Sequence, residues 1–443
     1  MNAIRTLPPA SPAVAPTGWM LTLLTLLYTF SFVERQILSL LVAPIRADLK
    51  LGDTGVSLLL GFAFAVVYAA AGVPVARLID TRTRRSLIGA SLLLRGVSMI
   101  GAGLSWGVLQ FGAFRMLSGL GLSALSPAAY SLISDSIPKE RRASAIAVYN
   151  VGTYAGSGLA FVLGGLLTGL TARRAEWVVP LLGSLRPWQF TLVLVALPAL
   201  VMAPLCWTLR EPRRLASAAH DGSSGFAGWY RAHRKTLVTH HLGFALIALG
   251  AYSMGAWNPA FMERTYGWSA SRSAIAVGLV SLIAGPAGIL AGGRLADRLS
   301  RKGVADAAIR VTLWAIAPAV LLLPAVYASP RAEISLAAMF AAALLFSMSS
   351  GLGHAALQQV TPPYLRARAA GVFILVLTLV GLGTGPTLVA ALTQFGFRQD
   401  SALRYSLLIV IAAAWMAGAV LLQAGRPSYR AAAVAMKEPV ASA

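Results

Sequence analysis

The chain has 443 residues, of which 57% are hydrophobic and only 12% charged, and its mean hydropathy is +0.71. Because an ordinary soluble domain carries about 25% charged residues, this composition excludes a soluble globular protein and indicates that lipid surrounds most of the surface. The formal net charge of +22 does not predict nucleic-acid binding, since the basic residues cluster in short connectors between apolar runs. The single cysteine, Cys206, excludes an internal disulfide and a cysteine-based metal site.

Twelve apolar segments reach the length of about 20 residues that a helix needs to cross a bilayer. In chain order they are 18–41, 54–79, 86–106, 108–134, 143–170, 188–209, 237–262, 269–296, 304–328, 333–358, 369–395 and 402–423. The first segment exceeds the signal-peptide core of about 7–15 residues, so we expect it to be retained as a membrane helix.

These segments predict an all-α integral membrane protein with two pseudo-symmetric six-helix bundles, at 18–209 and 237–424. A polar linker at 210–236 separates the bundles, a disordered tail is expected at 1–17, and a cytoplasmic tail at 425–443. Most of the 37 lysines and arginines fall on the side that carries both termini, so the positive-inside rule predicts cytoplasmic termini. The Ala- and Arg-rich composition suggests a bacterium, and hence its inner membrane.

A charged connector occurs twice, at 75–85 and at 292–302, each time between two apolar segments. The two copies share an Arg-Leu-x-Asp core, and Asp297 follows Asp80 by 217 residues, close to half of the chain. A repeat of this length within a membrane protein is typical of secondary transporters built from two homologous halves.

Four charged residues, Glu34, Arg35, Arg95 and Arg115, lie within predicted membrane helices. Exposing such a group to lipid costs at least about 2.5–3.5 kcal/mol, so all four should face the bundle interior. They form either a proton-titrating carboxyl group with an anion site, or a structural ion pair of Glu34 with Arg115 or Arg35. Three positive charges against one negative charge favour an anionic substrate, because a buried excess of positive charge is costly unless an anion compensates it.

Aromatic and amide side chains of the fifth and seventh segments are further candidates for contact with a substrate. Membrane-interface anchoring is the alternative for the tyrosines and the tryptophan. The candidates are Tyr149, Asn150, Tyr154, Tyr252, Trp257 and Asn258.

The repeated connectors, together with Arg115-x-x-x-Gly119-x-Gly121, resemble motifs of the major facilitator superfamily. Within it, the chain is most similar to Spinster-like transporters. That similarity runs through 32–49, 61–68, 126–138, 210–212 and 381–386. The resemblance implies two rocking bundles and, as substrates, lysophospholipids or sphingoid phosphates.

The resemblance also implies roles for individual residues. Glu34 and Arg35 match an acidic-basic pair implicated in proton coupling, and Arg115 matches the arginine that interacts with it. A further set matches a cytoplasmic gate that forms when the cavity opens outward. Its members are Asp80, Arg84, Arg85, Asp297, Arg298 and Arg301.

Two positions depart from the Spinster-like pattern. Leu122 stands where the family has a glutamate, and Arg95 stands where it usually has a tryptophan. Both changes make the predicted cavity more positive, which favours an anion and leaves Glu34 as the one obvious proton site.

We therefore expect a monomeric secondary transporter of an amphiphilic or organic anion, coupled to protons through Glu34, with Arg35, Arg95 and Arg115 contacting the substrate. One alternative is a multidrug/proton antiporter for lipophilic compounds, and another is a membrane sensor that binds without transport. The chain carries no His-Glu-x-x-His, Gly-x-Ser-x-Gly or phosphate-cradling motif, so we expect neither an enzyme nor a cofactor. Membrane lipids are the expected surroundings, and nucleic acid is not an expected partner.

Overall fold

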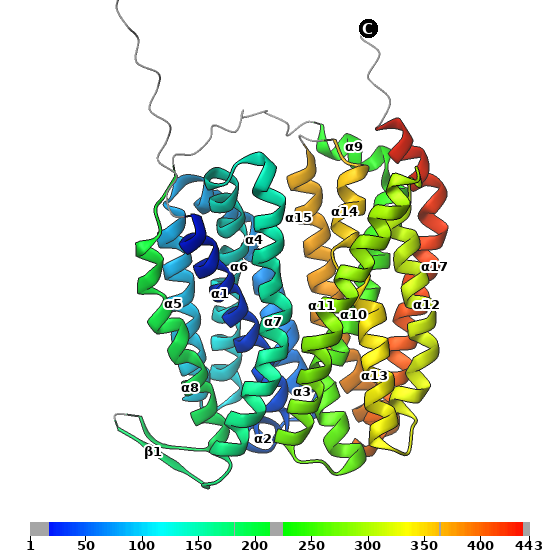
Figure 1. Ribbon diagram of the computed structural model, residues 1–443. Coiled ribbons are helices and arrows are strands. Elements are labelled where there is room, and N and C mark those ends of the chain that lie inside the picture. Colours follow the sequence, from blue (N-terminus) through cyan, green and yellow to red (C-terminus); the bar gives the residue numbers. More distant parts are fainter. Residues whose placement is uncertain (1–16, 181, 213–224, 363–364, 437–443) are drawn as a thin grey trace, which may run out of the picture.

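The computed structural model describes residues 17–180, 182–212, 225–362 and 365–436. Two groups of long helices stand side by side (Figure 1). We call residues 17–212 the N half and residues 226–436 the C half. The face where the first helix begins and the last one ends is the terminal face, and the opposite face is the hairpin face, where β1 (Trp177–Val179) pairs with β2 (Gly183–Leu185).

The N half consists of eight α-helices, three short helical segments and the β-hairpin. Its helical elements are α1 (Thr17–Gln36), η1 (Ile37–Leu40), α2 (Val42–Asp48), α3 (Asp53–Ser57), η2 (Leu58–Phe62), α4 (Ala63–Thr81), α5 (Arg84–Gly103), α6 (Val108–Ser136), α7 (Lys139–Thr171), α8 (Pro187–Met202) and η3 (Pro204–Thr208).

The C half begins with a short helix on the terminal face and continues through the long helices of the second bundle. Its elements are α9 (Phe226–Ala232), α10 (Arg234–Tyr266), α11 (Ala270–Arg301), α12 (Ala307–Tyr327), α13 (Ala332–Ser347), α14 (Leu352–Gln359), α15 (Arg366–Val376), η5 (Leu377–Thr384), α16 (Gly385–Ala391), η6 (Leu392–Phe397), η7 (Asp400–Ala402) and α17 (Leu403–Ala435).

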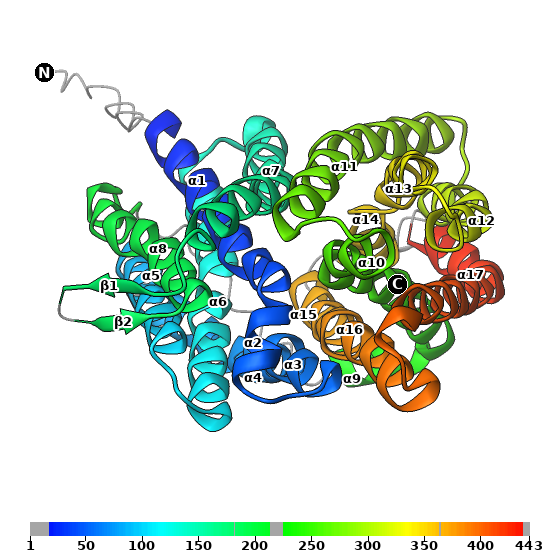
Figure 2. The same cartoon turned by 90° about the horizontal axis from the view of Figure 1, so that it is seen from below.

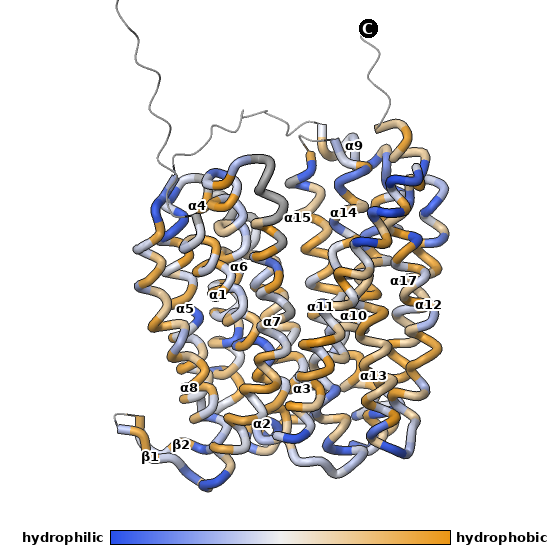
Figure 3. The backbone as a smooth tube through the Cα atoms, viewed as in Figure 1, coloured by the Kyte–Doolittle hydropathy of each residue, from blue (hydrophilic) through white to orange (hydrophobic). Residues whose placement is uncertain are grey.

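The expected membrane-spanning organisation is confirmed. Among the described residues, 11 helices are long and apolar enough to cross a membrane, and a helix pair bent by 58° supplies a twelfth span. The bend separates α1 with η1 from α2, close to Pro44, whose ring and missing N–H oppose a straight helix. Apolar residues dominate the helices between the two faces, while hydrophilic residues gather toward their ends (Figure 3).

Among the described residues, the apolar core that joins the two halves lies toward the hairpin face. One buried cluster combines N-half residues such as Ile37, Phe111 and Phe161 with C-half residues such as Phe261. A second cluster, which includes Leu24, belongs to the N half alone and lies on its terminal side. Apolar burial therefore holds the halves together near the hairpin face.

Helices α7 and α11 pack directly against each other across the boundary between the halves (Figure 2). A Cβ atom at Gly158 of α7 would lie 2.7 Å from Leu282 of α11, and one at Gly278 of α11 would lie 2.8 Å from Phe161 of α7. Glycine at these two positions allows the close helix approach that packing in lipid requires.

Two expected segments differ in detail. The last helix, α17, continues past the expected end at 423 to Ala435, because Tyr429 donates a hydrogen bond to the carbonyl of Ala356 and stabilises the extension. The tenth span breaks between α13 and α14, where Gly351 has a φ of 81°. Parts of the expected tails and linker, at 1–16, 213–224 and 437–443, lie outside the described residues.

Candidate functional site

Three of the four charged membrane residues form a buried cluster inside the N half. Glu34 of α1, Arg95 of α5 and Arg115 of α6 are each no more than 3% exposed. Glu34 and Arg95 form an ion pair through Oε2 and Nη2, and Arg95 also donates to the carbonyl of Ser31 at 3.1 Å. The predicted inward orientation of these side chains is thus observed, but the ion-pair partner of Glu34 is Arg95.

Arg115 was expected to pair with Glu34, and the structure gives it a different bonding partner. Its Nη2 donates to the carbonyl of Leu60 at 3.0 Å, and its guanidinium lies 5.2 Å from the centre of the Phe64 ring. Leu60 belongs to η2, a π-helical segment in which the hydrogen bonding is irregular and a carbonyl can accept from a side chain. Among the described residues, Arg115 therefore has no hydrogen bond to a carboxylate.

Several side-chain atoms of the four charged membrane residues are buried and have no hydrogen-bond partner among the described residues. They are Oε1 of Glu34, Nε and Nη1 of Arg95, Nε of Arg115 and Nε of Arg35. Unsatisfied guanidinium donors in an apolar surrounding are costly, and an anionic ligand can satisfy them.

Arg35 lies where the two halves meet. Its guanidinium is 4.4 Å from the centre of the Phe32 ring in α1 and 5.5 Å from that of Tyr252 in α10. The side chain is only partly buried. Two aromatic rings can support a cation without neutralising it, so Arg35 remains available to a negatively charged group.

A tyrosine cluster lies near α1 on the terminal side of Glu34. Tyr149 of α7 stacks on Tyr28 with ring centres 4.4 Å apart, and its hydroxyl donates to Ser126 at 3.4 Å. Tyr130 donates to the side-chain carbonyl of Asn150 at 2.9 Å. The cluster thus contains two of the predicted contact residues, whereas the side chain of Tyr154 lies outside the described part of the chain.

Trp257 and Asn258 are not beside the buried charges. Trp257 is 1% exposed and donates to the carbonyl of Pro386 at 3.0 Å. Asn258 is bonded to Tyr327 at 2.9 Å and to the sulfur of Met339 at 3.4 Å. Both side chains thus have their polar partners inside the C half, because the middle of α10 packs against α13, α16 and α17 there.

The predicted gate residues of the N half are bonded within that half. Arg84 forms ion pairs with Asp135 of α6 and, at 2.7 Å, with Glu211. Partial burial tends to raise the pKa of Glu211, but hydrogen bonds from Arg84 and Arg85 outweigh that effect and hold the pKa below its ordinary value. Arg85 also donates to the carbonyl of Leu209 at 3.1 Å.

The C-half gate residues are exposed at the terminal end of α11. They are Asp297, Arg298 and Arg301. Within the described part of the chain, no ion pair joins them to the N half. The side chain of Asp80 lies outside that part. A terminal-face gate between the two halves is therefore not observed in this conformation.

The ion pairs that connect the halves lie instead at the hairpin face. Asp53 of α3 is 2% exposed and accepts from Arg264 of α10 at 2.5 and 2.9 Å. Arg46 of α2 contacts Asp53 at 3.3 Å and Asp400 at 2.6 Å. We call these four residues the hairpin-face latch. They lie in or beside the short connectors, where a charge is ordinary, so sequence patterning did not single them out.

Leu122, at the position of the missing glutamate, packs with the apolar core on the terminal side of the N half. An acidic side chain is thus absent here, and the apolar packing around Leu122 leaves the nearby arginines without that negative charge. The excess of positive charge inferred from the sequence therefore persists in the structure.

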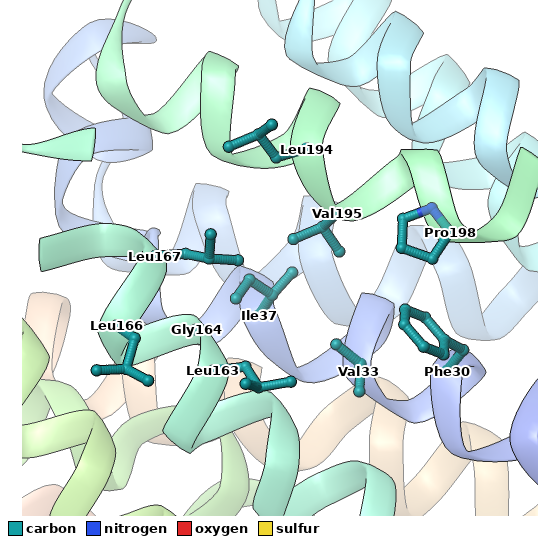
Figure 4. A pocket seen from close by; sticks show the side chains of 10 residues that line it. All are labelled: Phe30, Val33, Ile37, Leu163, Gly164, Leu166, Leu167, Leu194, Val195 and Pro198. Atoms are coloured by element: carbon teal, nitrogen blue, oxygen red, sulfur yellow. The ribbon is translucent and has the colours of Figure 1, made fainter. Parts of the chain in front are cut away.

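The described residues also form an apolar pocket of about 270 Å³ between α1, α7 and α8 (Figure 4). Val33 of α1 and Ile37 of η1 point into it, opposite Leu163 and Leu167 of α7 and Val195 of α8. The pocket contains none of the buried charges, and its lining offers no polar group to fix a charged ligand. It is therefore separate from the candidate site.

The sequence model of the Major Facilitator Superfamily matches residues 24–386. An "MFS-type efflux pump" of Mycolicibacterium smegmatis is 29% identical over 419 residues, which are 92% of this chain and 92% of that protein. The "Cis,cis-muconate transport protein" of Acinetobacter baylyi is 23% identical over 76% of this chain and 78% of that protein.

Among solved structures, a bacterial homologue of the human lysosomal transporter Spinster, in an inward-facing and unoccupied conformation, superposes with a TM-score of 0.77. The alignment covers 98% of this chain and 100% of that chain at 22% identity. At this low identity the superposition shows the fold alone. It agrees with the Spinster-like resemblance of the motifs.

Proposed function

Since the chain belongs to the major facilitator superfamily, a family of membrane transporters rather than enzymes, we propose that this secondary transporter carries an organic anion. Its charged group binds between the halves at Arg35, beside the buried Glu34–Arg95 pair and Arg115. The amphiphilic anions predicted by the Spinster-like resemblance are one form of this substrate, and smaller carboxylates are another.

The observation that carries the proposal is the uncompensated positive charge. Arg35, Arg95 and Arg115 face a single carboxylate, Glu34, and between them have four buried nitrogen atoms without a hydrogen-bond partner among the described residues. An anion supplies both the missing negative charge and the missing acceptors. The name of the muconate transport protein supports the same substrate class, because muconate is a carboxylate anion.

The tyrosine cluster suits the rest of such a substrate. Tyr28 and Tyr130 are partly exposed and offer aromatic faces and hydroxyl groups on the terminal side of Glu34. Aromatic side chains pack against apolar or unsaturated groups, and their hydroxyls hydrogen-bond to polar substituents. Asn150, bonded to Tyr130, fixes one of these hydroxyls.

Coupling to protons is proposed to act through Glu34 and Arg95. Protonation of Glu34 removes one charge of the ion pair, so Arg95 must find another negative partner. The substrate anion is that partner. Binding of a proton and binding of an anion therefore favour each other, as a symporter requires. Arg115, initially expected to respond to Glu34, contributes positive charge to the same site.

Alternating access is proposed to exchange the two sets of ion pairs. The hairpin-face latch is closed in this structure, and among the described residues no ion pair joins the terminal-face gate residues across the halves. With both termini in the cytoplasm, as the charge distribution predicts, this conformation opens inward. In the other state the terminal-face gate forms and the latch opens, and the two sets must be similar in strength for the cycle to turn.

A second candidate is the export of lipophilic compounds, favoured by the 29% identity with the efflux pump over nearly the whole chain. The two functions differ in their substrate. The apolar pocket and the tyrosines accept a neutral lipophilic compound, whereas the arginines have no role in binding it.

The proposal is tested in proteoliposomes with labelled cis,cis-muconate and a labelled lysophosphatidate as probes. An inward proton gradient should accelerate uptake of at least one of them by wild type, and Glu34→Gln should abolish the acceleration. Arg331→Gln, a change at an exposed position on the hairpin face, is the control and should behave as wild type. Transport of a neutral lipophilic dye without transport of either anion would favour the second candidate.

A further inference from the structure

A second cluster of charges lies on the terminal face of the C half, away from the transport site. Asp306, between α11 and α12, is 1% exposed and accepts from three arginines: Arg310 at 2.9 Å, Arg426 at 2.7 Å and Arg430 at 2.9 Å. We call these four residues the Asp306 cluster. One carboxylate against three guanidinium groups leaves a net charge of +2.

The geometry directs the surplus charge outward. Each arginine reaches Asp306 through its Nε atom, so the Nη1 amino group of each fork lies on the side away from the carboxylate. Among the described residues, one of these amino groups has a side-chain partner, since Nη1 of Arg426 donates to Gln423. The side chains of Arg310 and Arg430 are 32% and 43% exposed.

The corresponding cluster of the N half is balanced differently. There Arg84 meets two carboxylates, Asp135 and Glu211, and is only 1% exposed. One half thus neutralises its buried arginine, while the other holds three arginines on one acid. The packing of the helix ends does not require this surplus of positive charge. The surplus therefore indicates a negatively charged partner.

The position of the cluster indicates which partner. Helices α12 and α17 form the outer edge of the C half, remote from α7 and the N half in both views (Figures 1 and 2). Arg426 follows the start of α17 by 23 residues, about 35 Å along the helix. The hydrocarbon core of a bilayer is about 30 Å thick, so Arg426 lies at headgroup level.

An exposed apolar track runs from the cluster toward the membrane centre. Trp314 lies one helical turn below Arg310 and is 54% exposed, and Leu321 lies two turns further and is 79% exposed. Their spacing of four and seven residues puts all three on one face of α12. A tryptophan below a cation is typical of the membrane interface, and the track suits an acyl chain.

We propose that the Asp306 cluster binds the headgroup phosphate of an anionic phospholipid, whose acyl chain lies along Trp314 and Leu321. Asp306 positions the three arginines by holding their Nε atoms, and the outward amino groups of Arg310 and Arg430 donate to the phosphate. This site is independent of the substrate path and does not rest on the proposed function.

Native mass spectrometry of the purified chain with phosphatidylglycerol and, separately, phosphatidylcholine tests the site. Wild type should bind phosphatidylglycerol at least tenfold more tightly than phosphatidylcholine. Each arginine near a membrane surface changes affinity for an anionic lipid roughly fivefold, so Arg310→Gln/Arg430→Gln should weaken phosphatidylglycerol binding by about 25-fold. The control Arg331→Gln/Arg398→Gln removes equal charge from the hairpin face and should leave binding unchanged.

Two further measurements keep the test decisive if the double variant fails to fold. Arg430→Gln alone, which removes the most exposed arginine of the cluster, should still weaken binding about fivefold. High salt should weaken phosphatidylglycerol binding to wild type but not phosphatidylcholine binding. Equal binding of the two lipids, or unchanged binding in the Arg310 and Arg430 variants, would overturn the proposal.

Discussion

Asp53 in the N half accepts two hydrogen bonds from Arg264 in the C half, at 2.5 and 2.9 Å, and so ties the halves together at the hairpin face. Asp53 is nearly fully buried, and Arg46 contacts it from a second side. A bidentate pair of this kind is directional and breaks as one unit. It therefore stabilises the conformation in which the hairpin face is closed.

Arg264→Gln should shift the conformational equilibrium toward an open hairpin face. Loss of a charged hydrogen-bonded pair costs about 1–3 kcal/mol, enough to change the population ratio roughly 5- to 150-fold. Spin labels at the exposed positions Trp106 and Arg331 should move apart, and labels at Thr83 and Lys302 on the terminal face should approach. Unchanged distance distributions would show that the latch does not set the resting state.

The Glu34–Arg95 pair should show strong coupling in a double-mutant cycle. Arg95→Gln leaves Glu34 as an unpaired buried charge, which costs about 3–5 kcal/mol, whereas removal of both charges is far less costly. We expect Arg95→Gln to lower the thermal unfolding midpoint and the double variant Glu34→Gln/Arg95→Gln to recover most of the loss. Additive effects of the two single variants would contradict a direct pair.

Gly121→Ala should displace the side chain of Arg95, because the new methyl group would collide with it. A Cβ atom at position 121 would lie 2.5 Å from Cγ of Arg95 and 3.0 Å from the carbonyl of Ser91. Overpacking of this kind costs about 1–3 kcal/mol and displaces the guanidinium from Glu34. Gly72→Ala is the matched control, because nothing lies within 4 Å of its new Cβ. Thermal unfolding of the two variants should therefore differ, with only Gly121→Ala destabilised.

Asp306 should make stability depend on pH. Partial burial tends to raise the pKa of Asp306, but hydrogen bonds from Arg426 and Arg430 outweigh it and lower the pKa. A carboxyl group whose pKa is lower in the folded state stabilises the fold. Its full contribution to the free energy of unfolding is present at pH values above the unfolded-state pKa of about 3.9, and the contribution is lost as the pH falls through the folded-state pKa.

The thermal unfolding midpoint of Asp306→Asn should therefore be much lower than that of wild type at neutral pH. The difference between the two midpoints should decrease below about pH 4. Asp297→Asn, a change at an exposed carboxylate on the same face, serves as the control and should show little difference at either pH. A gap that stays constant with pH would mean that the charge of Asp306 does not stabilise the fold.

The sequence predicted the membrane-spanning helices and the repeated halves, because twenty-residue apolar runs and a half-length repeat are visible without tertiary contacts. It also predicted that Glu34, Arg95 and Arg115 lie inside, since lipid exposure is too costly. It did not predict which arginine bonds to Glu34, because helical spacing gives depth but not rotation. Arg115 instead donates a hydrogen bond to the carbonyl of Leu60, which lies in the π-helical segment η2.

The hairpin-face latch escaped prediction for a related reason. Asp53 and Arg264 are 211 residues apart, and each lies at the end of an apolar segment, where charged residues are common. The packing of α3 against α16, and of η1 against α10, brings them together. The predicted substrate contacts Trp257 and Asn258 stay a prediction, and their polar groups have partners inside the C half.

Transport by Arg35→Gln tests the central claim most directly, namely that an anion binds between the halves at an unneutralised arginine. In the part of the chain that the structure describes, Arg35 forms no ion pair with a carboxylate, so its replacement should preserve the fold. We expect uptake of cis,cis-muconate or lysophosphatidate to fall at least tenfold relative to wild type and to Arg331→Gln, with an unchanged unfolding midpoint. Uptake of the anion at the wild-type rate by Arg35→Gln would contradict the account.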